Sequence, residues 1–500
     1  MRNIGIVFIM CVGLCSGILR ANEQLKQVFD GIPFPVERTP IELMNDNVDA
    51  WYARWNVITS AKSTIDVVYF TVEPDVHGKA FLGMLLKKAL KGVKVRLLID
   101  GRGSMTLAGG VLANGAGGHV YLEGLVDAGV EVAVFNPIFS NIEQFVRDAV
   151  NDQQFDVKRL IASNHDKIVV VDGKLTITGG RNIQNRYLTS PQEADQVFRD
   201  TDVFMEGSSL APPLTAAIEE ELANEQTVRI AGSPGGGGAV WWYLPFCARA
   251  MDAWMKGDSI RTTTEAERAY VEELEHLTAS RDYLNYRPFR TQHEARVKVI
   301  DKHSILGEKN EITKALIEMI DATQHELIIQ NPYIVLTDEA RAALKRANDR
   351  GVKIIIHTNS PASTDSLPTQ AFFLDDWIEL LKSMRNLQIW VYTTSRLQLH
   401  AKVFVFDKKI AAIGTYNMDY LSERINSEVI TLIASDTFSS ETADEILNVD
   451  LPRSKQYRIE ILPSGEVRVI YGPMMTIEQR RDIQIKLDLI RKARFLKPLI

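Results

Sequence analysis

The sequence contains very few cysteines. Only three occur among 500 residues, and two of them, Cys11 and Cys15, fall in an apolar segment at the start of the chain. No cluster of cysteine and histidine has the spacing of a zinc site. Without that first segment, Cys247 would be the one remaining thiol and no internal disulfide could form. We therefore expect the protein to depend on its hydrophobic core, which a chain of this length can supply.

The chain also lacks an excess of basic residues. It has 57 Lys and Arg against 64 Asp and Glu, which gives a formal net charge of -7. Proteins that bind nucleic acid rely on contacts to phosphates and usually carry a strong positive charge. The composition therefore weighs against a nucleic-acid partner, although a local basic groove could lie within an acidic average.

One apolar run stands out at the amino terminus. Arg2 precedes it, residues 4–14 carry no charge, and small residues follow before Ala21. This is the layout of a secretory signal that is cleaved after Ala21, and the run is short for a membrane span. We expect residues 1–21 to be a signal peptide. An uncleaved anchor and a lipid attached to Cys15 are the alternatives.

The rest of the chain repeats itself. Residues 66–70 and 92–100 are predicted strands separated by a helical stretch, and residues 326–330 and 351–357 repeat this arrangement. Strand–helix–strand units of this length are typical of α/β layering with mainly buried strands. We predict two similar α/β halves: residues 22–295 form the N-terminal half with a linker, and residues 296–500 form the C-terminal half with a basic tail.

Each half contains the same motif at identical offsets. The first copy is His165, Lys167, Asp172, Gly179, Gly180 and Asn182, and the second is His400, Lys402, Asp407, Gly414, Thr415 and Asn417. A lone His-x-Lys would carry no information. Two copies with the same spacing, in corresponding places of a duplication, are very hard to obtain by chance.

The spacing within the motif places its polar groups together. Apolar residues follow each His-x-Lys, so each motif enters a buried strand, and alternation puts the histidine and the lysine on the same side. The glycines permit close approach of backbones, and each asparagine supplies an amide. Two ordinary core strands do not explain this pattern, because burying a lysine without a partner is costly.

An imidazole beside an ammonium suits attack on a phosphodiester. One histidine would attack phosphorus and form a covalent intermediate. The other would protonate the leaving alcohol and then accept a proton from the incoming water or alcohol. The lysines and asparagines would hold the non-bridging oxygens. Because the lysines supply the positive charge, we expect no metal and no cofactor.

An acid that follows each motif could orient its histidine through the other ring nitrogen. Asp202 follows the first motif and Glu428 follows the second. For Asp172 and Asp407, within the motifs, we expect a structural role rather than a catalytic one.

These residues resemble the phospholipase D superfamily, whose signature is a duplicated His-x-Lys-x4-Asp-x6-Gly-[Gly/Ser/Thr]-x-Asn. The resemblance runs from about residue 50 to 440 and includes Pro332-Tyr333 and residues 199–202. It implies two similar halves with the active site at their interface, His165 as nucleophile and His400 as general acid/base. The near symmetry of the motifs leaves the reverse assignment open. One chain would hold both half-sites, which predicts a monomer.

A phospholipid is the substrate that we expect, with a membrane surface as partner and an alcohol or water as acceptor. The chain looks more like bacterial cardiolipin synthases than like the one-motif nucleases of the superfamily. It lacks the paired membrane spans of many such synthases, so a phospholipase D hydrolase and a phosphatidyltransferase both stay open. The resemblance and the first segment imply an exported, periplasmic or membrane-associated bacterial protein. A metal-independent endonuclease is the alternative.

The end of the chain, residues 480–500, is basic and amphipathic. We expect a terminal helix with a solvated face, and binding to anionic lipid is the alternative interpretation.

Overall fold

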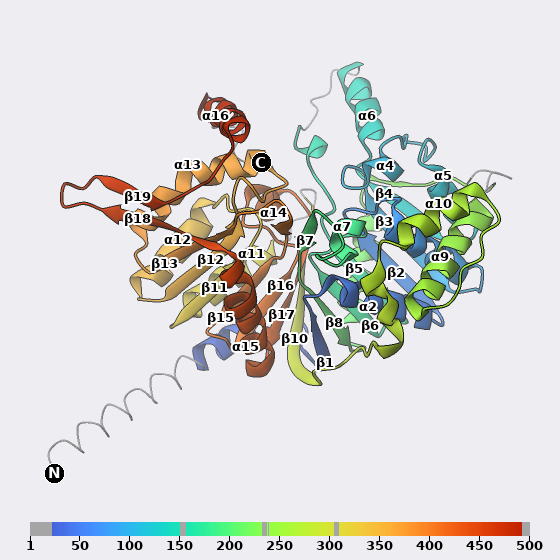
Figure 1. The fold of residues 1–500 in the computed structure, drawn as a ribbon, viewed down its shortest axis with the longest axis horizontal. Helices are drawn as coiled ribbons and strands as arrows, with labels where there is room; N and C mark the ends of the chain where they lie inside the picture. Colours follow the sequence, from blue (N-terminus) through green and yellow to red (C-terminus); the bar gives the residue numbers. More distant parts are fainter. Residues whose placement is uncertain (1–22, 151–156, 233–237, 239, 305–309, 493–500) are drawn as a thin grey trace, which may run out of the picture.

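Two α/β halves lie side by side in the computed structural model of this protein (Figure 1). The structure describes residues 23–150, 157–232, 238, 240–304 and 310–492. The expected signal segment, residues 1–21, lies outside these ranges. Within them, no helix has both the length and the apolar character needed to span a bilayer.

The sheet of the first half combines parallel and antiparallel strands. Its strands are β2 (Thr64–Tyr69), β3 (Lys94–Asp100), β4 (Glu131–Phe135), β5 (Lys167–Val171), β6 (Leu175–Gly179), β8 (Asp202–Glu206) and β9 (Thr227–Arg229). The order is β4-β3-β2-β5-β6-β8, in which β2, β3 and β4 are parallel and the later pairings are antiparallel. Strand β9 pairs with the outer edge of β4.

The sheet of the second half repeats this order. Its strands are β11 (Glu326–Gln330), β12 (Lys353–Asn359), β13 (Leu387–Tyr392), β15 (Val403–Phe406), β16 (Ile410–Gly414), β17 (Glu428–Ala434), β18 (Lys455–Ile461) and β19 (Val467–Tyr471). The order β13-β12-β11-β15-β16-β17 has the same parallel and antiparallel pairings. The prediction of two similar α/β halves is confirmed.

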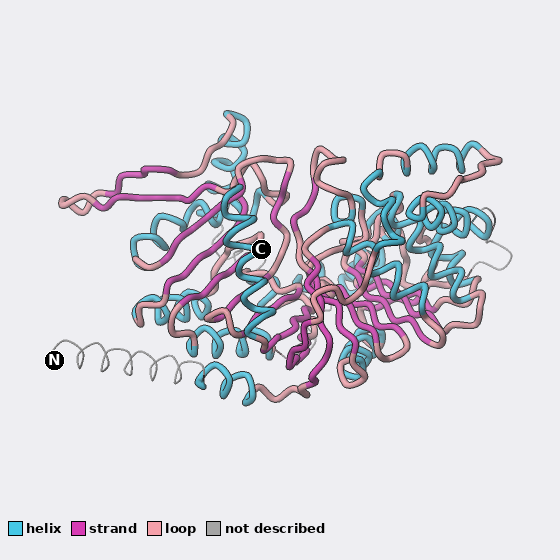
Figure 2. The backbone as a smooth tube through the Cα atoms, turned by 60° about the horizontal axis from the view of Figure 1, so that its bottom comes forward, coloured by secondary structure: helices cyan, strands magenta, loops and turns pink. Residues whose placement is uncertain are grey.

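Two long strands join the halves into one sheet. Strand β1 (Glu37–Met44) pairs with β8 of the first half and with β10 (His293–Lys302), and β10 continues onto β17. The described strands thus form a continuous 17-stranded sheet, in which the two sets meet in the middle of the molecule (Figure 2). The expected boundary between residues 295 and 296 falls inside β10.

Helices cover both halves, and many begin at a side-chain cap. In the first half they are α2 (Asn47–Ser60), α3 (Val76–Ala89), α4 (Met105–Ala108), α5 (Val120–Asp127), α6 (Ile138–Val150), η1 (Val157–Leu160), α7 (Asn185–Leu188), α8 (Ala211–Leu222), α9 (Val240–Lys256), α10 (Glu265–Leu274) and η2 (Thr278–Asn285). In the second half they are α11 (Glu311–Ala322), α12 (Asp338–Asp349), α13 (Leu367–Ser383), α14 (Tyr420–Arg424), α15 (Asp436–Glu445), η3 (Ile446–Asp450), η4 (Leu451–Arg453) and α16 (Ile477–Lys492). At α10, Thr264 and Glu267 form a capping box that satisfies the first free N–H groups.

The hydrophobic core has one large cluster in each half and a third large cluster between them. The third contains Val68 and Val170 from the first half and Val403 and Val405 from the second, all fully or almost fully buried. Leu25, from the helical residues 23–31, packs into the cluster of the second half. The start of the described chain therefore lies against the C-terminal half.

The motif aspartates bind the backbone of the turn that precedes β2 in the first half and β11 in the second half. Asp172 accepts hydrogen bonds from the backbone N–H groups of Lys62, Ser63 and Thr64 at 2.7–2.9 Å. Asp407 does the same for residues 324–326 at 2.8–2.9 Å. Both adopt positive φ, of 52° and 48°, at the tip of a hairpin. Neither is among the residues that line the cavity described below, in agreement with the expected structural role.

We expect Asp172→Asn to destabilise the protein by about 1–3 kcal/mol, because an amide nitrogen would face N–H groups that the carboxylate now accepts. The backbone hydrogen bonds lower the pKa of Asp172 to about 2. Its stabilising effect should therefore be complete above about pH 4 and be lost as the pH falls toward 2. Denaturant unfolding at neutral and acid pH measures both effects. Asp258→Asn, at an exposed aspartate, is the control, and equal stability of the two variants would contradict the prediction.

Candidate active site

A cavity of about 450 Å³ lies between the two halves and contains both motif histidines. His165, Asn182, His400 and Asn417 all line it. The carboxyl ends of the parallel strands on both sides also reach it, through Thr71 after β2 and Tyr333 after β11, among others. The prediction that the two motifs meet at the interface therefore agrees with the geometry.

His165 is oriented by an acid from the other half. Its Nδ1 lies 3.0 Å from Glu428 Oε2 and 3.1 Å from Oε1, and Ser422 donates its hydroxyl to Oε1 at 2.5 Å. Burial and the charges of Lys167 and Lys402 hold the pKa of His165 well below its usual value. Burial raises the pKa of Glu428 to about 7. The imidazole is thus neutral, and its Nε2 is the nitrogen free to act as a nucleophile.

His400 is oriented in the same way by an acid from the first half. Its Nδ1 lies 2.7 Å from Asp200 Oδ2, and Asp200 also accepts the N–H of Thr201 at 2.8 Å. The charges of His400 and Lys402 outweigh burial and keep the pKa of Asp200 well below its usual value. Burial lowers the pKa of His400, while the charge of Asp200 opposes that effect. An ionised partner favours an imidazole that can carry a proton.

Short parallel pairings between the halves set both contacts. Strand β7 (Val197–Arg199) pairs in parallel with β14 (Leu397–Leu399), so the next residues along the two strands are Asp200 and His400. Asn164 and Ser427 form an isolated parallel bridge, so the next residues there are His165 and Glu428. Backbone register thus places each histidine beside an acid of the other half.

The two motif lysines lie behind the histidines. Each side chain is about 1% exposed, and each ammonium donates to the backbone carbonyl of its own motif histidine. Lys402 Nζ also lies 2.9 Å from His400 Nδ1, and Lys167 Nζ lies over the ring of Phe70 at 5.3 Å. Burial lowers the pKa of Lys167 to about 7 and that of Lys402 to about 8. Neither lysine is among the residues that line the cavity.

The motif asparagines differ in their contacts. Asn182 Oδ1 accepts the N–H of Thr71 at 3.0 Å, and the Asn182 side chain also hydrogen-bonds Tyr187, which lines the cavity too. Asn417 Oδ1 is buried and has no hydrogen-bond partner among the described residues. Because an amide can be turned about its last bond, Asn417 can present a donor or an acceptor to a ligand.

Asp202 does not orient a histidine, and this part of the prediction is wrong. Its Oδ2 lies 2.9 Å from Arg54 Nη2 and 3.2 Å from Arg181 Nη1, and all three side chains are about 0–1% exposed. Its Oδ1 accepts the N–H of Arg181. Asp202 is therefore the counter-ion of two buried arginines. Asp200 orients a histidine, which is the role that was expected of Asp202.

The strand register of the two halves shows that Asp200 corresponds to Glu428. Gly414 pairs with Ile430 there, and Gly179 pairs with Asp202 in the first half. The residue two places before Ile430 is Glu428, and the residue two places before Asp202 is Asp200. Both acids stand at the same position relative to their motif glycine, but the sequence separations differ because the connecting segments differ in length.

The motif glycines are required by the close approach of the neighbouring strand. A Cβ at Gly179 would lie 2.5 Å from Asp202 Cα, and one at Gly414 would lie 2.7 Å from Ile430 Cα. At Gly180 a Cβ would lie 2.8 Å from Asp200 Cγ. Gly180 therefore leaves the space that the Asp200 carboxylate occupies.

Several polar side chains of the cavity were not predicted as site residues, although Tyr333 lies within the family resemblance. Arg102 donates to Ser163 at 2.8 Å, and Tyr333 donates its hydroxyl to Asp365 at 2.9 Å. Arg186 lies over the ring of Phe198 at 4.3 Å. These residues lie in loops after strands or in a short helix, where only the folded chain brings them together.

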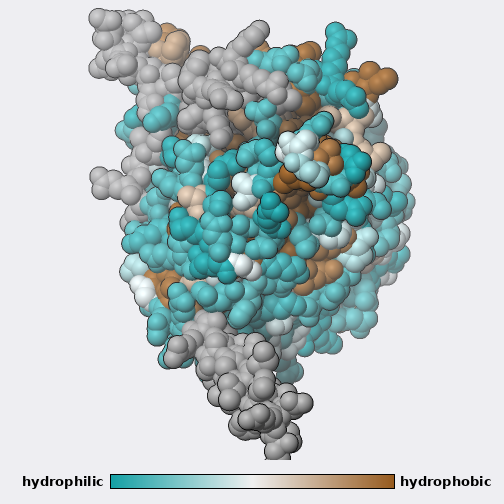
Figure 3. All heavy atoms as spheres, turned by 90° about the vertical axis from the view of Figure 1, so that its left-hand side faces the viewer, coloured by the Kyte–Doolittle hydropathy of each residue, from teal (hydrophilic) through white to brown (hydrophobic). Residues whose placement is uncertain are grey.

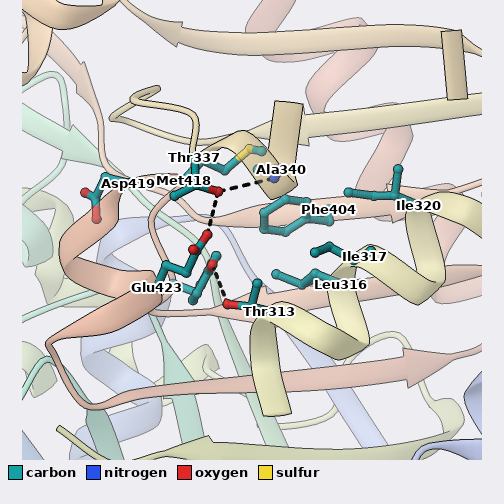
Figure 4. A pocket seen from close by; sticks show the side chains of 11 residues that line it. Thr313, Leu316, Ile317, Ile320, Thr337, Ala340, Phe404, Met418, Asp419 and Glu423 are labelled. Carbon is teal, nitrogen blue, oxygen red and sulfur yellow. Dashed lines mark hydrogen bonds between the residues drawn. The ribbon is translucent and has the colours of Figure 1, made fainter. Parts of the chain in front are cut away.

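A second cavity, of about 20 Å³, lies next to this site (Figure 4). Apolar side chains such as Phe404 line most of it, and Asp419 lines both cavities. Thr337 donates to Glu423 at 2.6 Å at its edge. It is about the size of one water molecule, so it holds no substrate.

Comparison with known proteins identifies a family. The family model described as "Cardiolipin synthase, PLD-like domain" matches residues 55–209 and 316–449. "Cardiolipin synthase 1" of Bacillus anthracis is 26% identical over 423 residues, which cover 85% of this chain and 68% of that protein. "Cardiolipin synthase C" of Escherichia coli (strain K12) is 26% identical over 458 residues, which cover 85% and 86%.

A solved structure has the same fold. The "phosphatidylserine synthase" of Haemophilus influenzae Rd KW20 superposes with a TM-score of 0.62 and covers 95% of this chain and 100% of its own. The sequence identity is 14%, so the likeness concerns the fold alone.

We expect Asp200→Asn and Asp202→Asn to have different effects. Asp202→Asn should destabilise the protein by about 3–5 kcal/mol, because two buried guanidinium groups lose their counter-ion. Asp200→Asn should instead lower the pKa of His400 further, because the charge of Asp200 raises it. Denaturant unfolding and ¹⁵N NMR of labelled histidine side chains measure the two effects. An unchanged His400 titration in Asp200→Asn would contradict the assignment.

Proposed function

This chain belongs to the cardiolipin synthase family of phospholipase D-like proteins, and from that membership we propose that it is a phosphatidyltransferase. It would cleave a phospholipid on the headgroup side of the phosphate and transfer the phosphatidyl group to an alcohol, with water as a competing acceptor. The observation that supports this proposal is the pair of buried, cross-oriented histidines in one cavity. The closest alternative activity is that of a phospholipase D hydrolase, which differs only in the acceptor.

In the proposed mechanism, His165 is the nucleophile. Its Nε2 attacks phosphorus and forms a phosphatidyl-histidine, while His400 protonates the oxygen of the leaving alcohol. The alcohol that enters next gives its proton to His400, and its oxygen displaces His165. The neutral state of His165 and the ionised partner of His400 support this division of roles. The reverse assignment would place the nucleophile beside the stronger anion.

The charges behind the histidines support binding of a phosphodiester. Lys167 and Lys402 are buried, and burial together with repulsion by Lys402 lowers the pKa of Lys167. An anionic phosphate in the cavity would relieve that repulsion and favour the charged form of both. Asn182 and Asn417 line the same cavity and offer amide donors to the non-bridging oxygens.

The far side of the cavity suits an acceptor with hydroxyl groups. Asp365, Ser366 and Thr369 line it, and Tyr333 holds Asp365 at 2.9 Å. These groups can donate hydrogen bonds to, and accept them from, the hydroxyl groups of a polyol. A glycerol headgroup fits this chemistry, so phosphatidylglycerol can serve as both donor and acceptor. Two molecules of it would then give cardiolipin and free glycerol.

The first test is incubation of the purified protein with phosphatidylglycerol vesicles in excess chelator. We expect cardiolipin and glycerol by mass spectrometry, and none from His165→Ala or His400→Ala. His276→Ala, at an exposed histidine, is the matched control and should retain full activity. Phosphatidic acid in place of cardiolipin would make the protein a hydrolase, and no lipid product would overturn the proposal.

A substrate with a good leaving group separates the roles of the histidines. Release of p-nitrophenolate from phosphatidyl-p-nitrophenol needs no general acid. His400→Ala should therefore release about one equivalent per enzyme in a burst and then stall as a phosphatidyl-enzyme, whereas His165→Ala should release none. Stopped-flow absorbance measures the burst, and intact-protein mass spectrometry detects the adduct. A burst from His165→Ala alone would reverse the assignment.

We expect a bell-shaped pH dependence of kcat/KM. Activity should rise as Glu428, with a pKa of about 7, loses its proton and can accept the Nδ1 hydrogen of His165. It should fall as Lys167 and Lys402, with pKa values of about 7 and about 8, lose theirs. Initial rates across the pH range give the profile, and Glu428→Gln should remove the acidic limb. An acidic limb that persists in this variant would contradict the role of Glu428.

A further inference from the structure

Helix α6 exposes an apolar face. Phe139, Ile142 and Val146 are 51%, 50% and 53% exposed. They follow one another at intervals of three and four residues, so they lie on one side of the helix. A single exposed apolar side chain is ordinary, but three on one face of a 13-residue helix need an explanation.

Helix α16 of the other half exposes a similar face. Ile477, Ile485 and Leu489 are 91%, 50% and 61% exposed, and intervals of eight and four residues put them on one side. The opposite side is the one that packs on the protein, because Ile483 is 2% exposed and contacts Ala371. The apolar face of α16 therefore points away from the molecule.

Both helices are attached to the rim of the active-site cavity. In α16, Gln479 donates to the carbonyl of Pro361 at 3.1 Å, at the start of the segment that supplies Asp365 and Thr369 to the cavity. In α6, Asn141 donates to the Asn136 side chain at 2.6 Å.

The contact of α6 leads directly to the first motif. Asn136 itself donates to the carbonyl of Ala162 at 2.7 Å, three residues before His165. In Figure 1, α6 and α16 stand at the top of the molecule, one above each half. Figure 3 views the side that bears α16, where hydrophobic side chains interrupt a largely hydrophilic surface.

Basic side chains accompany the apolar ones. Arg480 and Arg481 are exposed on α16, and Arg147 is exposed in the last turn of α6. Arg147 borders the apolar face of α6, whereas on α16 Arg481 lies between Ile477 and Ile485, and exposed acidic residues also occur there. A helix that exposes apolar and basic side chains on one face binds at the interface of a bilayer, and anionic headgroups strengthen the binding.

We propose that α6 and α16 together form a docking surface for an anionic phospholipid bilayer, which holds the mouth of the cavity against the headgroups. The proposal rests on the proposed function, because that activity needs a substrate drawn from a bilayer. Two separate helices, one from each half, are each hydrogen-bonded to a segment that leads to the one cavity. This placement favours a lipid surface as the occupant over a second copy of the chain.

The test compares double variants of exposed residues that lie outside the catalytic machinery. Phe139→Ser/Ile142→Ser alters α6, and Ile477→Ser/Ile485→Ser alters α16. The matched control is Leu90→Ser/Leu284→Ser, at side chains that are 52% and 64% exposed. Leu90 follows α3 and precedes β3, at the end of the strand away from the cavity.

Two measurements are made on each protein. The first is co-sedimentation with equimolar phosphatidylglycerol and phosphatidylcholine vesicles, or with phosphatidylcholine alone. The second is activity on vesicles and on monomeric short-chain phosphatidylglycerol. Both test variants should bind anionic vesicles about tenfold more weakly and lose vesicle activity in proportion, while activity on monomeric lipid stays unchanged. The control should match the wild type in every assay.

The other outcomes each decide against a specific claim. Unchanged vesicle binding by both variants would overturn the docking surface, and so would equal losses on vesicle and monomeric substrate. If light scattering shows that the wild type is a dimer and that either variant is not, the exposed face binds a second copy of the chain instead. Absence of activity on both lipid forms in the wild type would reject the proposed function, while the binding measurement would still test the docking surface.

Discussion

Each histidine of the active site is held by a carboxylate from the other half of the molecule, and the rest of the site depends on this exchange. Neither half alone has a complete histidine–acid pair. The pairs form because two short parallel pairings, β7 with β14 and Asn164 with Ser427, fix the halves in register. The continuous sheet through β1 and β10 and the shared core cluster keep that register rigid. The contacts that pack the two halves together therefore also fix the catalytic geometry.

The exchange requires many charges to be buried at the interface. Burial is costly for each of them, so they are arranged as compensated pairs. Asp202 neutralises Arg54 and Arg181, and Arg199 Nη2 of the first half lies 3.1 Å from Asp450 Oδ2 of the second. The motif lysines are the exception, because the nearest group to each is a backbone carbonyl or a histidine. The carboxylates of Glu428 and Asp200 oppose the lowering of both lysine pKa values, and these are the acids of the two histidine–acid pairs.

The fold is nearly symmetric, but the electrostatics are not. Glu428 is raised in pKa and faces a neutral His165, whereas Asp200 stays ionised beside His400. Burial dominates at Glu428, whereas the charges of His400 and Lys402 dominate at Asp200. The residue after the motif glycine also differs. Gly180 leaves space for the short Asp200 side chain, while Thr415 accepts the N–H of Val429 at 2.9 Å next to Glu428. A duplicated scaffold thus provides two histidines suited to different steps.

The sequence by itself determined the α/β class, the duplication and the two sets of motif residues, because periodicity and repeated spacing are local properties of the chain. It also predicted the structural role of Asp172 and Asp407. It could not select between Asp200 and Asp202, since the two acids stand close together in the sequence and the break between β7 and β8 that separates them is visible only in the structure. Only the tertiary structure decided that Asp200 faces His400 and Asp202 faces two arginines. It alone decided that each acid serves the opposite half, because docking of two halves depends on contacts between residues 200 or more positions apart.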